Sequence, residues 1–356
     1  MNILYLTPRY YPHVGGIEYV VKSVAERLAK QGHNVTVLCG ETGINVPREE
    51  WVNGVHVVRW PVWSPGDAYH IPKMRNRLAR WLLGIGNKCD VIHLHSVHGI
   101  LPMYSLRVLR SSSVRKVLTP HYHGTGHTLF RSILWILWRR LVSRLIKSVD
   151  VIHCVSNHEA NLVRRSLKIG CTVIEHGVDE QIKSLEWKPE DYALYAGRIE
   201  WYKNIERLAR IIKILNINHG LNLELKIIGD GPHKRKLIKH LEKLRVDYEL
   251  SPFKPYEEYI KILSRALFIA NLSTKEAYAL TINEANAIGV PAVIVEPWGL
   301  NFSEKSRTLI TQLYKSNEDI AQEIIAFLSK IRKQPKPEVP GWNQIVDIYV
   351  KNLYNL

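Results

Sequence analysis

Short apolar runs alternate with segments of helical spacing along most of the chain. Between several of these runs the apolar positions follow a helical period, as at residues 17–30, where Val20, Val21, Val24 and Leu28 fall on one side. Strands that are almost wholly apolar and separated by helices are typical of a parallel sheet covered on both faces. In the first half of the chain we expect such strands at residues 3–7, 35–39, 55–60, 91–95, 116–120, 151–156 and 172–175.

A second series of the same kind begins after a polar stretch at residues 180–189. The pattern therefore predicts an α/β protein of two doubly wound domains, at residues 1–181 and 182–335, whose sheets face one another across a cleft. A proline-rich connection after Lys330 leads to a last helix, and residues 340–356 are expected to pack back on the first domain. The strands of the second series are expected at residues 192–196, 223–228, 248–250, 267–272 and 291–295.

Composition narrows the class of protein. A chain of 356 residues that is 46% hydrophobic and 23% charged is ordinary for a globular protein and excludes disorder for its bulk. The four cysteines lie far apart in sequence, which excludes a disulfide scaffold or a zinc ribbon and favours a reducing compartment. The first residues read as a strand instead of a signal peptide, and no apolar run reaches the ~18–20 residues of a membrane span. We expect a cytoplasmic protein.

The net charge of +16 is concentrated in one part of the chain. Residues 51–158 contain 15 Lys and Arg but 3 Asp and Glu. Within this stretch, residues 129–147 hold five cations and no acid beside Trp135 and Trp138, and Trp81 lies in a similar basic segment. One interpretation is peripheral contact with the cytoplasmic face of an anionic membrane, with a lipid-linked acceptor. The other is a pair of core-packed helices with a solvated basic face.

Glycines and cations follow the first strand of each predicted domain. Gly15 and Gly16 precede a helix, where backbone N–H groups can approach an anion, although a plain flexible loop fits equally well. Gly197 and Arg198 follow the strand at residues 192–196, and Lys203 follows shortly after. Two cations at the carboxyl end of a strand suit a diphosphate leaving group; ordinary surface charge is the alternative. Gly229 opens a further glycine turn after the next strand.

Two carboxylates flank the start of a predicted helix in the second domain. Glu276 lies in the loop before that helix, and Glu284 lies about 7–8 Å along it from Ala279. One carboxylate can face a sugar while the other accepts hydrogen bonds from ribose hydroxyls. The N-terminal amides of the helix can hold phosphate.

Together these motifs resemble glycosyltransferase family 4, whose members are retaining, nucleotide-sugar-dependent enzymes of the GT-B fold, with two Rossmann-like domains. The resemblance rests on Glu276-x7-Glu284, Gly197-Arg198 with Lys203, Gly15-Gly16, and the segments at residues 119–126, 155–159, 176–179 and 229–232, in that family's order. It implies that Arg198 and Lys203 bind the donor diphosphate, that Glu276 contacts the transferred sugar, and that Glu284 contacts the ribose. It places Gly16 near phosphate or sugar and His121 near the reacting carbon. The donor-binding residues it implies are Gly15, Gly16, Gly197, Arg198, Lys203, Gly229, Tyr278, Ala279, Leu280 and Glu284.

The resemblance also implies that no metal and no other cofactor is needed, and the sequence has no Asp-x-Asp pair of the metal-binding kind. His93-x-His95 and His121-x-His123 each place two imidazoles on one strand face, a possible metal geometry, but core or cleft-lining histidines are the favoured interpretation. The sequence departs from the family at Tyr278 and Ala279, where phenylalanine and glycine are usual, and in the region after Val295, where Glu-Pro-Trp298-Gly stands instead of a Gly-Gly turn.

We therefore expect a retaining hexosyltransferase that moves a sugar from a nucleotide-diphosphate sugar, carrying UDP, GDP or ADP, to a hydroxyl on a saccharide or lipid-linked acceptor. A sugar-nucleotide epimerase of the same architecture is the first alternative. A nucleic-acid-binding protein is the second, and it is disfavoured because the aromatics of the basic stretch have helical spacing.

Overall fold

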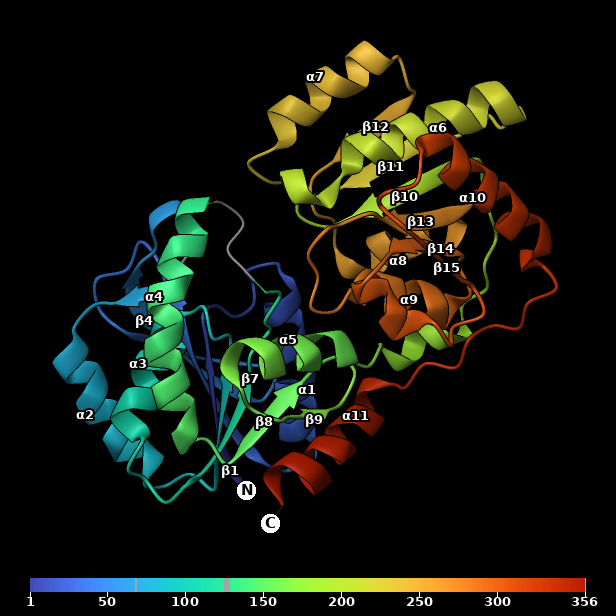
Figure 1. The fold of residues 1–356 in the computed structure, drawn as a ribbon. Helices are drawn as coiled ribbons and strands as arrows, with labels where there is room; N and C mark the ends of the chain where they lie inside the picture. The colour runs from blue at the N-terminus through green and yellow to red at the C-terminus, as the bar shows by residue number, and fades with distance from the viewer. Residues whose placement is uncertain (68, 125–128, 356) are drawn as a thin grey trace. The chain divides into compact units, whose positions relative to one another are not determined.

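The structure is a computed structural model that describes residues 1–67, 69–124 and 129–355 (Figure 1). The chain folds into two compact units, one of residues 1–176 with 342–356 and the other of residues 177–341. The boundary lies at His176, a few residues before the position expected from the polar stretch, and the closing helix is part of the first unit.

The first unit is built on a nine-stranded sheet whose centre is parallel. Strand β1 pairs with β2 on one side and β6 on the other, and its residues Ile3–Leu6 are fully buried, as expected for a strand covered on both faces. The strand order is β3-β4-β2-β1-β6-β7-β8-β9, with β5 on the edge of β4. The strands are β1 (Asn2–Thr7), β2 (Asn34–Glu41), β3 (Arg48–Val52), β4 (Val55–Trp63), β5 (Ile71–Pro72), β6 (Val91–His95), β7 (Arg115–Thr119), β8 (Val151–Cys154) and β9 (Thr172–Val173).

Alternate residues of these strands meet different helices. Leu4, Leu6 and Leu94 belong to a core shared with α2, α3, α4 and α5, whereas Tyr5 and His93 point to the face where the chain's last turn packs. Helix α5 begins at Ser156, whose hydroxyl accepts the N–H of Glu159 at 3.0 Å. The helices are α1 (Gly16–Lys30), α2 (Arg75–Gly86), α3 (Ile100–Leu109), α4 (Leu129–Leu145), α5 (Asn157–Leu167), α11 (Trp342–Tyr349) and the π-helical turn η6 (Val350–Tyr354).

The second unit is a six-stranded, wholly parallel sheet of order β12-β11-β10-β13-β14-β15. Helix α6 contacts α7 and α10, and α8 contacts α9, so the two groups of helices enclose a single apolar core (Figure 1). The strands are β10 (Tyr192–Ala196), β11 (Glu224–Ile228), β12 (Tyr248–Ser251), β13 (Phe268–Asn271), β14 (Ala292–Val295) and β15 (Thr308–Thr311). The helices are α6 (Ile205–His219), α7 (Lys234–Leu244), α8 (Tyr256–Arg265), α9 (Leu280–Ile288) and α10 (Asn317–Ile331).

The predicted strands all form, and three more appear at sheet edges. Strands β3 and β5 pair antiparallel with β4, and β15 extends the second sheet. The apolar pattern missed β3 because an edge strand keeps charged side chains in solvent, as Arg48, Glu49 and Glu50 do here.

Candidate active site

Loops at the carboxyl ends of β10, β11 and β12 pack together through their backbones. Gly197 N–H donates to Ile228 O at 2.9 Å, and Ile199 N–H donates to Asp230 O at 2.9 Å. Gly229 has φ of +153°, and a Cβ atom there would overlap the carbonyl oxygen of Gly197, so a side chain cannot be accommodated. The result is a bare stretch of main chain at the edge where parallel sheets bind ligands.

Lys203 and Glu276 form an ion pair at the same edge of the sheet. Lys203 ends the short turn η4 (Trp201–Lys203), Glu276 follows β13, and their side chains are 13% and 14% exposed. Asn271, the last residue of β13, donates its side-chain amide N–H to Glu276 Oε1 at 3.0 Å. Lys203 binds the same oxygen atom. The family resemblance implies different roles for these two charges, and the structure brings them into one largely buried cluster, where an ionic interaction is stronger than in open solvent. Asn271 was missed, although a polar residue that closes an apolar strand is a recognisable signal.

Arg198 lies at this edge but has a different partner. Its guanidinium is 54% exposed and pairs with Glu200 at 3.3 Å. The Arg198 main chain is fixed by the Tyr195 hydroxyl, which donates to its carbonyl oxygen at 2.8 Å. The side chain is therefore a solvent-accessible cation on an anchored backbone.

Helix α9 begins beside Glu276. Its N-cap residue, Ala279, supplies no side-chain cap, so no side chain of the cap residue competes for the first amides, which begin with Leu280. The Tyr278 ring packs against Phe302 with centroids 5.3 Å apart. The buried Trp298 donates its indole N–H to the carbonyl oxygen of Ser273 at 2.7 Å and so fixes the loop before the helix.

Glu284 lies on the buried side of this helix. It is buried, and Tyr259 donates its hydroxyl to Glu284 Oε2 at 2.9 Å. Burial raises the pKa of the Glu284 carboxyl to about 7, although the tyrosine hydrogen bond opposes the shift.

In the first unit, Gly15 is the N-cap of α1 and Gly16 its first residue. A Cβ atom at Gly15 would overlap the carboxylate of Glu18, which folds back over the helix start. Glycine at this position thus lets the helix bring its own acidic side chain to the positive end of its dipole.

His121 follows β7 and has φ of +49°, which is uncommon for a side-chain-bearing residue. Its Nε2 lies 2.9 Å from Nδ1 of His95, the last residue of β6. His93 and His153 share the hydroxyl of Thr119, each at 2.8 Å. His93, His95 and His153 lie in a hydrogen-bonded core, which His121 joins through His95. The expectation that His121 and His123 share a strand face was wrong, because β7 ends at Thr119 and both follow it.

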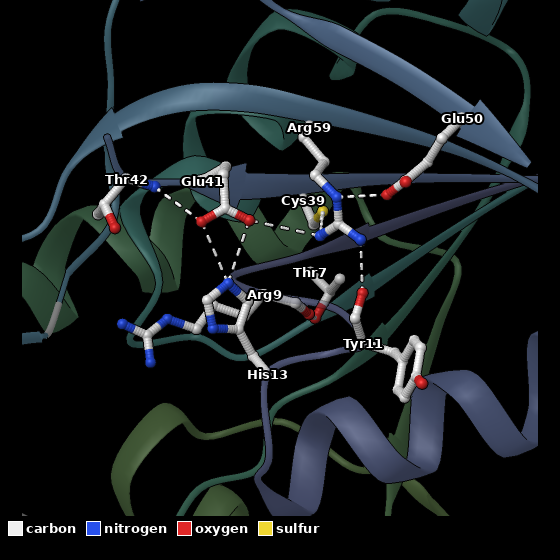
Figure 2. Close-up of polar contacts among 9 residues, drawn as sticks. All are labelled: Thr7, Arg9, Tyr11, His13, Cys39, Glu41, Thr42, Glu50 and Arg59. Carbon is white, nitrogen blue, oxygen red and sulfur yellow. Dashed lines mark hydrogen bonds and ion pairs between the residues drawn. The ribbon is translucent and has the colours of Figure 1, made fainter. Parts of the chain in front are cut away.

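A charged cluster missed by the sequence analysis lies where β1 and β2 end (Figure 2). Arg59 on β4 binds Glu50 and the carbonyl oxygen of Tyr11, each at 2.5 Å, and its Nη1 lies 3.4 Å from Glu41. Glu41 also binds the His13 imidazole at 3.1 Å. Arg59 thereby fixes the loop that leads to Gly15 and Gly16. No spacing rule links a strand arginine to acids on two other strands, so only the fold reveals it.

The tryptophans of the basic stretch are not interfacial residues. Trp135 is buried, and the half-buried Trp138 donates its indole N–H to Val97 O at 2.9 Å, because the helical period places both on the inner side of α4. Trp81 likewise packs against the core. The outer side of α4 instead exposes Ile136, Leu137 and Leu141. None of the described helices combines the length and apolarity that a membrane crossing needs.

No group of three or more histidine, cysteine, aspartate or glutamate side chains suited to holding a metal ion occurs among the described residues.

Comparison with known proteins follows the division into two units. Residues 14–182 match the profile described as Glycosyltransferase Family 4, and residues 178–337 match the one described as Glycosyl transferases group 1. The chain belongs to glycosyltransferase family 4.

Relatives of this glycosyltransferase include proteins whose names contain a lipid. It is 22% identical over 325 residues to the phosphatidylinositol N-acetylglucosaminyltransferase GPI3 subunit of Saccharomyces cerevisiae, covering 84% of this chain and 69% of that protein. It is 25% identical over 361 residues to the alpha-monoglucosyldiacylglycerol synthase of Streptococcus pneumoniae, covering 92% and 78%.

Solved structures establish the GT-B fold of this glycosyltransferase. Anabaena Alr3699/HepE, solved in complex with UDP and glucose, matches with a TM-score of 0.73 and 14% identity over 100% of both chains. The two α/β units with parallel sheets are therefore the two Rossmann-like domains of that fold.

Proposed function

We propose that the protein is a retaining hexosyltransferase that moves a sugar from a nucleoside-diphosphate sugar to a hydroxyl acceptor. The observation that carries the proposal is the Lys203–Glu276–Asn271 cluster beside the bare main chain at Gly197 and Gly229. A cation held next to a carboxylate, at the carboxyl-end edge of a parallel sheet, can serve the phosphate and the sugar of one donor.

The charges fit the departure of a diphosphate. Lys203 and Arg198 supply positive charge where the leaving oxygens gain negative charge, and the amides that start α9 add the helix dipole. Because these fixed groups stabilise the leaving group, the scheme needs no metal ion. The Glu276 carboxylate accepts hydrogen bonds from hydroxyls of the transferred sugar.

Retention follows if the acceptor attacks the face that the diphosphate leaves. The bond from the anomeric carbon to the phosphate oxygen breaks, the bond to the acceptor oxygen forms, and the acceptor proton passes to the leaving diphosphate. His121 acts beside the reacting carbon in this scheme. Glu284, when ionised, accepts hydrogen bonds from the ribose of the donor. UDP, GDP and ADP sugars all contain this ribose.

We propose a lipid-linked acceptor at an anionic membrane surface. The support is the outer side of α4, where Ile136 and Leu137, 51% and 60% exposed, lie beside Arg140 and Arg144 in a segment without acids. The names of the two relatives, a phosphatidylinositol N-acetylglucosaminyltransferase subunit and an alpha-monoglucosyldiacylglycerol synthase, add to it.

Flotation with vesicles tests the membrane part. The full chain should float with vesicles containing phosphatidylserine and not with phosphatidylcholine alone, and Leu137→Glu with Leu141→Glu should abolish flotation. Ile217→Glu, at an exposed position on α6, is the matched control and should float normally. Equal flotation of the α4 variant and the control contradicts a membrane role for α4.

The transfer itself is tested with a panel of UDP, GDP and ADP hexoses and saccharide or glycolipid acceptors. The expected product carries the donor's anomeric configuration and forms only when acceptor is present. An altered sugar nucleotide without acceptor would instead identify an epimerase, and an inverted product would contradict retention.

A further inference from the structure

We infer that His95 is a positioning residue that fixes the tautomer of His121. His95 Nδ1–H donates to His121 Nε2, so His121 carries its own proton on Nδ1 and offers that N–H to the substrate. His121 is then a hydrogen-bond donor and not a general base. This assignment rests on the proposed transfer, in which His121 lies beside the reacting carbon.

The two rings are placed for an in-plane hydrogen bond. The N–N distance is 2.9 Å, the ring planes differ by 25°, and the centroids are 5.2 Å apart. At that centroid separation such a short N–N distance requires the two nitrogens to point at one another, edge to edge. His121 adopts φ of +49° to reach this position, a conformation that costs energy for a residue with a Cβ.

The other nitrogen of His95 decides which ring donates. His95 is 1% exposed, and its Nε2 has no hydrogen-bond partner within the described part of the chain. If His121 donated, the neutral His95 would carry its proton on Nε2, as a buried N–H without an acceptor. Buried N–H groups without partners are rarer in proteins than unpaired acceptors. The proton of His95 therefore belongs on Nδ1.

Both rings are neutral. Burial and the neighbouring imidazoles of His93, His153 and His176 hold the pKa of His95 well below its usual range, and burial lowers the pKa of His121 to about 3. The phenol of Tyr5, whose ring lies 5.6 Å from that of His95, is uncharged as well, since burial raises its pKa. A neutral His95 has a single proton to give.

In the adjoining hydrogen-bond network, the proton positions can be assigned in the same way, starting from a group that can only accept. The Ile174 carbonyl oxygen can only accept, so His153 donates Nε2–H to it at 2.8 Å and accepts at Nδ1 from Thr119. Thr119 in turn accepts from His93 Nε2–H, whose Nδ1 accepts from Tyr354 at 2.9 Å. Each imidazole in this hydrogen-bonded network has one proton, and its neighbour determines which ring nitrogen carries that proton.

The consequence concerns the acceptor proton. With Nε2 accepting from His95 and Nδ1 protonated, His121 has no lone pair left to take a proton. Its N–H can stabilise an oxygen of the transferred sugar, and the proton of the acceptor hydroxyl must go elsewhere, to the departing diphosphate.

Nitrogen-15 NMR of the histidine-labelled full chain tests this directly, with His121→Gln used to assign the His121 signals. We expect His121 to be protonated on Nδ1 in the native protein. In His95→Phe the preference should be lost, and in His95→Asn, whose amide can donate, it should be retained. A native His121 protonated on Nε2, or one unchanged in His95→Phe, overturns the inference whether or not the protein transfers sugar.

Kinetics give the second readout. His95→Phe should lower kcat about tenfold or more with little change in donor KM, and His95→Asn should recover most of it. His98→Phe removes an imidazole that stacks on His123 instead, with centroids 5.1 Å apart, and should leave kcat unchanged. If His95→Phe retains native kcat with a native circular-dichroism spectrum, His95 has no positioning role. If His95→Asn and His95→Phe lower kcat equally, the assignment of His95 as the hydrogen-bond donor is wrong.

Discussion

The indole N–H of Trp298 lies 2.7 Å from the main-chain carbonyl oxygen of Ser273, inside the second unit. Ser273 is itself buried and opens the loop that carries Glu276. The Trp298 side chain thus has a structural role, because its indole braces the loop that carries Glu276.

Trp298→Phe keeps most of the buried ring and removes this hydrogen bond. We expect the free energy of unfolding to fall by about 1–3 kcal/mol, since the Ser273 carbonyl is left without its partner. Urea unfolding followed by circular dichroism measures the change. Trp201→Phe, at an indole that is 52% exposed, should cost less than about 0.5 kcal/mol, and equal losses in both variants would show that the hydrogen bond is unimportant.

Gly229→Ala should be much more damaging than an alanine at another glycine of positive φ. The new Cβ would meet the Gly197 carbonyl oxygen, so the two loops must separate, at a cost of about 3 kcal/mol or more. Gly220→Ala is the matched control: φ is +67°, its Cβ would have open space, and the strain alone should cost about 1 kcal/mol. Similar stability losses, measured by urea unfolding, would exclude close packing as the reason for Gly229.

Arg59→Gln should destabilise the first unit because it leaves the carboxylates of Glu41 and Glu50 without their cation (Figure 2). The Arg59 side chain is 10% exposed, so a loss of about 3 kcal/mol is expected. Arg265→Gln breaks a solvent-exposed pair with Glu190 and should cost less than about 1 kcal/mol. Thermal unfolding of the two variants compares them, and an equal shift in Tm would contradict a special role for Arg59.

Acid should weaken the first unit before the second. Burial lowers the pKa of five imidazoles in this unit, to about 4 for His153; they are His93, His95, His121, His153 and His176. Because these groups are neutral in the folded protein, their contribution to the free energy of unfolding is fully present above pH 6.5 and is lost as the pH falls. For His153 alone the full loss is about 3 kcal/mol. Glu159 opposes this trend, because burial raises its pKa to about 7, but it is one group against five.

In the second unit the pKa of Glu284 is raised and that of His240 is lowered, so the two partly cancel. Hydrogen exchange with mass spectrometry at pH 7.5 and pH 5, corrected for intrinsic rates, should therefore show protection lost selectively from peptides of residues 1–176. Equal loss from both units would contradict the assignment.

The positions of the interior strands along the chain could be predicted because buried parallel strands are almost wholly apolar and leave a clear signal; their order in the sheets was not predicted. Glycines and charges that follow such strands drew attention to this edge of the second sheet, but the ion pair between Lys203 and Glu276 was not predicted. For the tryptophans of the basic stretch the sequence left membrane contact and core packing open, because it shows which residues lie on a helix but not which side meets the core; the structure packs these tryptophans against the core.

Other features depend on contacts between distant segments. Arg59 draws in groups from β2, β3 and the loop after β1, and His95 meets His121 only because β6 and β7 are neighbours. No local pattern predicts such partners.

The most direct test is the single-turnover rate of sugar transfer in Lys203→Ala and Glu276→Ala. Each should be slower by about 10²-fold or more, because a fixed charge is lost where charge develops in the transition state. Lys226→Ala, which removes a lysine paired with Glu249 on neighbouring strands of the same unit, should keep the native rate. Native rates in folded Lys203→Ala and Glu276→Ala proteins would contradict the account.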